Sequence, residues 1–316
     1  MYVKSEIQSR PFSAKVCEEG GEDGMIVLTG PWRTPSNLLT RQTYADHASI
    51  HDDSTALSLG FRGGAIEGPT HFSQFAPLLL QAFGLAWFNY GSISVNYKNA
   101  SYEGEELQAT LIVTPQNLAY ISLTKRDGTV VLVGTAGVGS GCENTLARQR
   151  LALARPLAAP RILAGCRPGL VAQKICVRLE RETPLGDLYP FSLVEKLHVI
   201  TEPSPWYLEG TSTPWGRAIL PVEMISVLCQ SVALQDSFPI HQPVVGLFLD
   251  QEILVVDGPL YPGVDYELER EIVRLSESHK TESMWIRTKI REKSTKRLCA
   301  EMLLNQGFLK ASSELY

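Results

Sequence analysis

The sequence contains no long apolar run, no Cys-x-x-Cys pair and no surplus of basic residues. A membrane-spanning helix needs ~20 consecutive, mostly apolar residues, and the first residues, MYVKSEIQSRPFSAKV, lack the apolar core of a secretory signal. The six cysteines are scattered, which is expected for reduced, packed thiols and not for a disulfide framework or a zinc site. We therefore expect a cytoplasmic protein without a membrane span.

The charge balance disfavours nucleic acid as a partner. The chain carries 29 Lys and Arg against 34 Asp and Glu, a net charge of −5, whereas nucleic-acid-binding proteins are usually basic. Its 316 residues are 44% hydrophobic and 20% charged, which is typical of a soluble globular protein with one large domain or two ordinary ones.

The most informative stretch runs from residue 44 to residue 83. It contains Asp46 and His51, an acid and a base, and then a glycine-rich turn at 60–68. The apolar residues that follow have the spacing of one face of a helix; they are Phe72, Phe75, Ala76, Leu79, Leu80 and Phe83. Backbone N–H groups at a helix start favour a negative oxygen. The stretch therefore predicts a proton-transfer site for a carbonyl compound.

Strands are expected on both sides of this helix. Their residues alternate or form short apolar runs at 25–29, 93–97, 107–113, 118–124 and 130–138. Asp127-Gly128 is typical of a hairpin turn between two of them. Strands in hairpin succession after one helix predict an α+β arrangement, an antiparallel sheet wrapped on the helix.

The second half of the sequence repeats this pattern. Residues 215–221 align with 62–68, and a second helix is expected at 222–238. The strands expected around it are 175–179, 253–256, 266–275, 284–290 and 298–304. We predict an N-terminal half at 1–143, a connector at 144–172 and a C-terminal half at 173–316.

The connector contains several arginines and no acidic residue. It is either a solvated linker that crosses the surface or a basic strip beside a phosphorylated ligand, and the first interpretation is preferred without geometry.

Residues 46–53, DHASIHDD, resemble a family motif. R-specific (type 2) enoyl-thioester hydratases and MaoC-like dehydratases carry D-x-N-P-[LIV]-H-x-[DE]; here Ala48 and Ser49 replace the Asn and Pro. Gly68 stands where this family has a glycine at the start of its central helix. The resemblance implies a double hotdog fold, in which each half wraps a curved antiparallel sheet around a long helix. It also implies a hydro-lyase that acts reversibly on a 3-hydroxyacyl or 2-enoyl thioester of CoA or acyl carrier protein, without a cofactor.

The resemblance also implies the site residues. Asp46 and His51 would be the acid–base pair, with their two roles not yet divided, and the N–H groups of Gly68 and Thr70 would stabilise the thioester oxyanion. Pro69 has no N–H and suits the first helical position. Further contacts with the substrate are assigned to Arg62, Gly63, Gly64, His71, Tyr97 and Lys98, although packing or capping is the preferred explanation of His71.

The repeat gives an internal comparison. With the offset of the aligned segments, Asp46, His51 and Gly68 correspond to Val199, Ser204 and Pro221. Because acid, base and N–H donor are absent together, the second half is expected to be structural and to help form the substrate tunnel. A monomer and a homodimer both remain open.

Other interpretations of these residues remain. Asp46 and His51 could be a surface pair, or His47 and His51 could bind a metal with Asp52 or Asp53, which are more simply explained as N-caps of a short helix. A hotdog thioesterase would use the same helix end and a carboxylate such as Asp46 or Glu67. A non-catalytic acyl-binding subunit is the third alternative.

Overall fold

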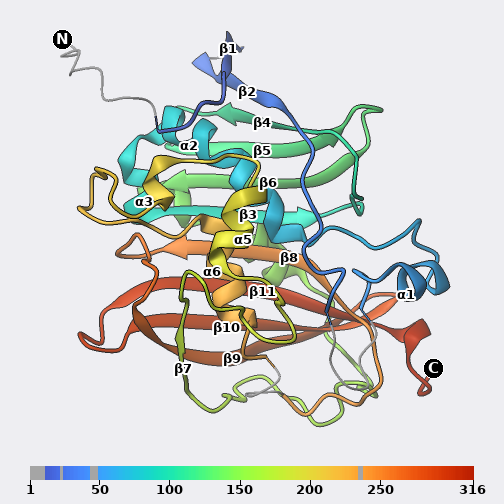
Figure 1. The fold of residues 1–316 in the computed structure, drawn as a ribbon. Coiled ribbons are helices and arrows are strands. Elements are labelled where there is room, and N and C mark those ends of the chain that lie inside the picture. The colour runs from blue at the N-terminus through green and yellow to red at the C-terminus, as the bar shows by residue number, and fades with distance from the viewer. Residues whose placement is uncertain (1–10, 22–23, 43–48, 234–237) are drawn as a thin grey trace.

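In the computed structural model, residues 11–21, 24–42, 49–233 and 238–316 are described. The strands of these residues form one antiparallel sheet in the order β1-β2-β4-β5-β6-β3-β8-β11-β10-β9-β7 (Figure 1). Their bounds are β1 Cys17–Gly20, β2 Ile26–Arg33, β3 Gly91–Tyr97, β4 Leu107–Val113, β5 Leu118–Lys125, β6 Val130–Val138, β7 Ile175–Arg178, β8 Gly246–Val255, β9 Asp265–Glu277, β10 Thr281–Glu292 and β11 Leu298–Leu309. Each strand expected from the sequence is found; β8, β9, β10 and β11 are longer than expected, and β7 is one residue shorter.

The strand order is symmetric about the β3–β8 pair. One side reads β3-β6-β5-β4-β2 and the other β8-β11-β10-β9-β7, so equivalent strands occupy equivalent places. β3 and β8 are antiparallel, with Ser94 opposite Glu252 and Asn96 opposite Asp250. This order agrees with the duplication seen in the sequence, and it joins both copies in one sheet. The exact limits of the two halves stay a prediction.

The helices cover both faces of the sheet. Figure 1 shows α2, α3, α5 and α6 in front of it. Ile93 and Val95 of β3 belong to the core that includes Phe72 and Phe75, whereas Ser94 points the other way and accepts a hydrogen bond from the N–H of Ala147. The helix bounds are α1 Asp53–Ser58, η2 Gly68–Phe75, α2 Ala76–Phe83, α3 Leu85–Tyr90, η3 Gly139–Cys142, α4 Leu146–Leu153, α5 Leu193–Val199, η4 Pro205–Tyr207, α6 Val222–Gln230 and η5 Lys310–Ser312.

The long first helix expected from the sequence is broken. It begins as the 3₁₀ helix η2 and continues as the α-helix α2. Pro77 has no N–H to donate to the Ser73 carbonyl four residues earlier, and the Ala76 N–H donates to this carbonyl instead. The apolar spacing correctly predicted the buried face, but the uniform helix was wrong.

The second helix is shorter than expected. α6 ends at Gln230, residues 231–233 form a turn, and residue 238 is not helical. Residues 234–237 lie outside the described part of the chain. None of the helices in the described ranges is both long and apolar enough to span a membrane.

The basic connector is neutralised by carboxylates of the sheet. Arg148 pairs with Glu252 at 3.0 Å, and Arg150 pairs with Asp250. The Glu252 and Asp250 side chains are almost completely buried, so these contacts are part of the fold. At these two positions the connector is tied to the sheet, whereas most of residues 149–161 are exposed, so the surface-linker interpretation stays a prediction for the rest of the segment.

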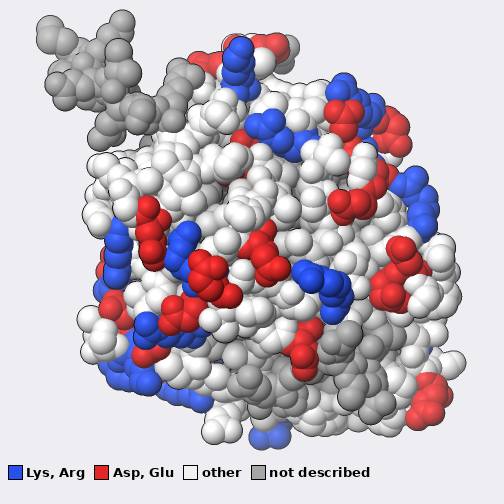
Figure 2. Space-filling view, viewed as in Figure 1, with Lys and Arg blue, Asp and Glu red and all other residues white. Residues whose placement is uncertain are grey.

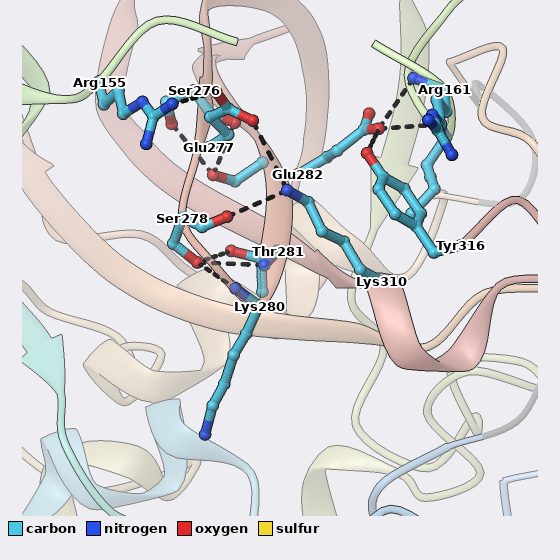
Figure 3. Close-up of polar contacts among 12 residues, drawn as sticks. Arg155, Arg161, Ser276, Glu277, Ser278, Lys280, Thr281, Glu282, Lys310 and Tyr316 are labelled. Atoms are coloured by element: carbon cyan, nitrogen blue, oxygen red, sulfur yellow. Dashed lines mark hydrogen bonds and ion pairs between the residues drawn. The ribbon is translucent and has the colours of Figure 1, made fainter. Parts of the chain in front are cut away.

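The connector is also tied to the far end of the sheet, as Figure 3 shows. Arg155 pairs with Glu277 at 3.1 Å. Glu282 on β10 accepts hydrogen bonds from the backbone N–H of Arg161 at 2.8 Å and from the Tyr316 hydroxyl at 2.6 Å. Basic and acidic side chains are interspersed on the face shown in Figure 2.

Candidate functional site

The candidate base, His51, lies in the turn that precedes α1. Asp52 caps this helix, since its carboxylate accepts a hydrogen bond from the Thr55 N–H at 2.9 Å. Asp53 occupies the first helical position, and its carboxylate accepts from the Gly64 N–H at 2.6 Å. The capping role expected for this acidic pair is thus found for Asp52, while Asp53 ties α1 to the glycine-rich turn.

The His51 ring is held in one tautomer. Its Nδ1 lies 2.6 Å from the Ala65 carbonyl oxygen, to which only a protonated nitrogen can donate. Nε2 therefore carries the lone pair. Burial lowers the pKa of His51, so the imidazole is neutral near pH 7 and can accept a proton.

The glycine-rich turn must approach His51 closely. A Cβ on Gly64 would lie 2.3 Å from the His51 carbonyl oxygen, so only glycine fits there. The Asn37 side chain donates to the same Ala65 carbonyl at 3.3 Å. Gly64 therefore supports the His51 loop, and neither Gly63 nor Gly64 lines either of the two cavities beside His51.

His51 lines two neighbouring cavities. The first has a volume of about 230 Å³ and includes Tyr97 and Lys98 in its wall. The second, about 340 Å³, extends toward the second half of the chain. The two walls share Ile50, His51, Glu67, Gly246 and Phe248. A bound molecule could therefore occupy both spaces while passing the imidazole.

The predicted partner Asp46 lies outside the described residues, as does His47. The acid–base pair expected from the motif therefore stays a prediction. The described residues contain no cluster of three or more His, Cys, Asp or Glu side chains that could hold a metal ion.

The two predicted N–H donors differ in position. Gly68 begins η2 and lines the first cavity; a Cβ there would come within 2.5 Å of the Tyr97 ring, so the glycine allows the close approach of this ring. Thr70 lines neither cavity, its N–H donates to the Glu67 carbonyl at 3.1 Å, and its hydroxyl accepts from Lys196 at 3.0 Å. Its expected part as an oxyanion donor is not supported, because the 3₁₀ turn already uses this N–H.

Glu67 is the acid that the described structure places beside His51. It is only 6% exposed and accepts a hydrogen bond from the Tyr189 hydroxyl at 2.9 Å. Burial raises the pKa of Glu67 to about 7, although the positive charge of Lys196 opposes this effect. From the sequence alone, Glu67 is considered only as the carboxylate of a thioesterase. Its position directly before Gly68-Pro69, where the helix is expected to begin, is the feature of the sequence that indicates a place in the site.

The remaining candidates divide into wall residues and surface residues. His71 lines the first cavity; its Nε2 lies 2.8 Å from the Ser101 hydroxyl, and burial lowers its pKa to about 3. The Tyr97 hydroxyl donates to Gln251 of the other half at 2.8 Å. Lys98 is exposed at the first cavity. Arg62 pairs with Glu105 on the surface and lines neither cavity.

No protein-family model matches the sequence, and no curated protein is detectably similar to it in sequence. Among the solved structures that resemble it in fold are two with 12% sequence identity each. One, from Chloroflexus aurantiacus J-10-fl, is described as a MaoC domain protein dehydratase; the match covers 89% of this chain and 95% of that chain, with a TM-score of 0.52. The other is a conserved hypothetical protein from Mycobacterium tuberculosis with a double hotdog fold, covering 93% of this chain and 94% of that chain, with a TM-score of 0.50. The chain thus shares the fold of MaoC-like and double hotdog proteins.

Proposed function

We propose that this chain is a hydro-lyase that adds water reversibly to a 2-enoyl thioester, giving the 3-hydroxyacyl thioester. The observation that carries this proposal is the neutral His51, fixed by Ala65 in the wall shared by two cavities, next to the start of η2. A base, a helix N-terminus and room for an acyl chain are the parts that this reaction needs.

In the dehydration direction a proton leaves the α-carbon and a hydroxyl leaves the β-carbon as water. Asp46 and His51, assigned from the motif, would hold the hydroxyl and carry out these proton transfers. Negative charge would develop on the thioester oxygen, where the Gly68 N–H at the helix start is the proposed donor. A positioned acid–base group contributes ~10²–10⁴-fold to such a rate.

The two cavities suggest how the substrate is divided. The first carries Lys98 at its exposed side, which suits the phosphate end of CoA or of a carrier-protein arm. The second is larger and includes Phe238, Phe248 and Met284, which suit an acyl chain. The thioester would then lie at the shared wall beside His51.

A second candidate function, hydrolysis of an acyl thioester, is favoured by one observation. Glu67 is a buried carboxylate in the same wall, at the start of η2. A hotdog thioesterase could use such a group to direct water at the carbonyl carbon.

Incubation with a 2-enoyl-CoA separates these functions. Loss of the enoyl absorbance without release of thiol is the expected result for a hydro-lyase. Release of free CoA with the enoyl group intact would show a thioesterase instead. A chain that binds the thioester but changes neither signal would be an acyl-binding protein, contrary to the proposal.

A further inference from the structure

Glu67 occupies an unusual position for a carboxylate. It is buried, it occupies the N-cap position of η2 without a side-chain capping hydrogen bond, and it lines both cavities together with His51. A buried carboxylate is normally paired with a cation because desolvation of the charge is costly. Among the described residues, no Lys or Arg nitrogen lies within ion-pair distance of Glu67, and the Tyr189 hydroxyl is its hydrogen-bond donor.

The cation whose charge lowers the pKa of Glu67 is already held by another acid. Lys196 of α5 pairs with Glu223 of α6 at 3.1 Å and donates to Thr70. Glu223 also accepts from the Ser73 hydroxyl at 2.7 Å. Lys196 therefore makes no ion pair with Glu67, and its positive charge lowers the Glu67 pKa from a distance. Glu67 remains in the wall of both cavities.

We propose that Glu67 is an acid–base group of this site and exchanges a proton with the β-oxygen of the substrate, while His51 exchanges one with the α-carbon. This inference builds on the proposed hydro-lyase function and gives the β-oxygen proton to Glu67, in place of the Asp46 role that the motif implies.

The proton balance of the step closes within the site. In dehydration, His51 Nε2 takes the α-proton and the electrons of this C–H bond form the C=C bond. The β C–O bond breaks, and the Glu67 proton goes to the departing hydroxyl, which leaves as water. The proton on His51 then returns to the Glu67 carboxylate through solvent.

The surroundings of Glu67 suit both of its protonation states. Burial favours the neutral acid, while the Tyr189 hydrogen bond and the Lys196 charge favour the carboxylate, and together they bring the pKa to about 7. Glu223 opposes ionisation, Tyr97 faces the same cavity, and Arg270 of β9 lines the second cavity. An acid whose pKa is near the working pH is the most effective proton carrier.

The test compares Glu67→Gln with the wild-type chain in the hydration of 2-enoyl-CoA over a range of pH. Gln keeps the shape of the side chain but can neither release nor take up a proton near neutral pH. The value of kcat should therefore fall ~10²–10⁴-fold while KM changes little. The wild-type pH profile of kcat should have a limb near pH 7, and the profile of the residual Glu67→Gln activity should lack this limb. The exposed Glu143→Gln substitution is the matched control and should leave rate and profile unchanged.

Tyr189→Phe gives a second, milder measurement. Removing its hydrogen bond to the carboxylate should move the same limb to higher pH without abolishing turnover. Thermal unfolding of each variant checks that it is folded. If folded Glu67→Gln keeps the wild-type kcat and pH profile, the assignment of Glu67 is overturned while the hydro-lyase function stands.

Failure of the function itself looks different. A wild-type chain that releases thiol and does not hydrate the enoyl group contradicts the hydro-lyase proposal and the β-oxygen role of Glu67 together. A wild-type chain with neither activity also overturns both. Only hydration that depends on Glu67 through its pH limb supports the inference.

Discussion

At the scale of single residues, the orientation and tautomer of His51 depend on a hydrogen bond that cannot be predicted from sequence patterns. The Ala65 carbonyl fixes its protonated nitrogen, and burial lowers its pKa. Burial keeps this base neutral at neutral pH although the Ala65 hydrogen bond raises the pKa, and the same hydrogen bond leaves the lone pair on Nε2. The motif identified the residue, but the carbonyl that orients it comes from a turn whose path depends on Gly64.

Replacement of His51 by Ala should lower kcat/KM for hydration by ~10²–10⁴-fold, because the group that takes up the α-proton is lost. The measurement is the loss of enoyl absorbance, with circular dichroism to confirm folding. His279→Ala, an exposed histidine on the other half, is the control. An unchanged rate in His51→Ala would remove this side chain from the mechanism.

Glu67 should also influence stability as pH changes. Its pKa is about 7 in the folded chain and 4.5 for a free side chain, so the folded state favours the protonated form. This contribution is complete below pH 4.5 and is lost as pH rises through 7, by about 3 kcal/mol at most. The difference in unfolding free energy between wild type and Glu67→Gln, measured with urea across this range, should follow that curve. A constant difference would contradict the raised pKa.

At the scale of elements, the helix at the centre of the first half shows what the sequence could predict. The apolar spacing identified its buried face, since Phe72, Phe75 and Leu79 are fully buried. The change from 3₁₀ to α geometry depends on Pro77, and the shortened α6 had no comparable marker. The buried contact between Lys196 of α5 and Thr70 could not be predicted, because it joins residues 126 positions apart.

The Lys196–Glu223 pair should hold α5, α6 and η2 together. Both side chains are at most 3% exposed, so Lys196→Met leaves a buried carboxylate without its cation and should cost ~3–5 kcal/mol. The double variant Lys196→Met/Glu223→Leu should regain much of this loss, since no isolated charge remains. Urea unfolding of the four chains of this cycle gives the coupling. Equal costs for the single and double variants would show that the pair does not act as a unit.

At the scale of the whole molecule, the duplicated pattern predicted two related halves, and the sheet shows how they join. β3 and β8 pair along five residues, and Asn96 donates to Asp250 across this pair at 2.9 Å. Sequence periodicity predicts strands but not which edges meet, because pairing depends on distant side chains. The salt bridges that attach residues 144–172 to β8 could not be predicted from the sequence for the same reason.

Separation of the two halves should therefore expose an unpaired strand edge at β3 that is prone to association. A fragment of residues 1–143 would leave the β3 backbone and its buried side chains in water, and unpaired edges of this kind associate. We expect it to aggregate or dimerise in size-exclusion chromatography, and to form a soluble complex when expressed with residues 144–316. A stable monomer of residues 1–143 would show that each half folds independently.

The hydroxyl of Tyr189 reaches from one half of the molecule to the acid of the other. The half in which Ser204 aligns with His51 is consequently more than a scaffold: its Tyr189 hydrogen bond helps to lower the pKa of a carboxyl group in its neighbour. Chimaeras that exchange this half for that of a related protein would inherit a different operating pH even where every residue around His51 is kept.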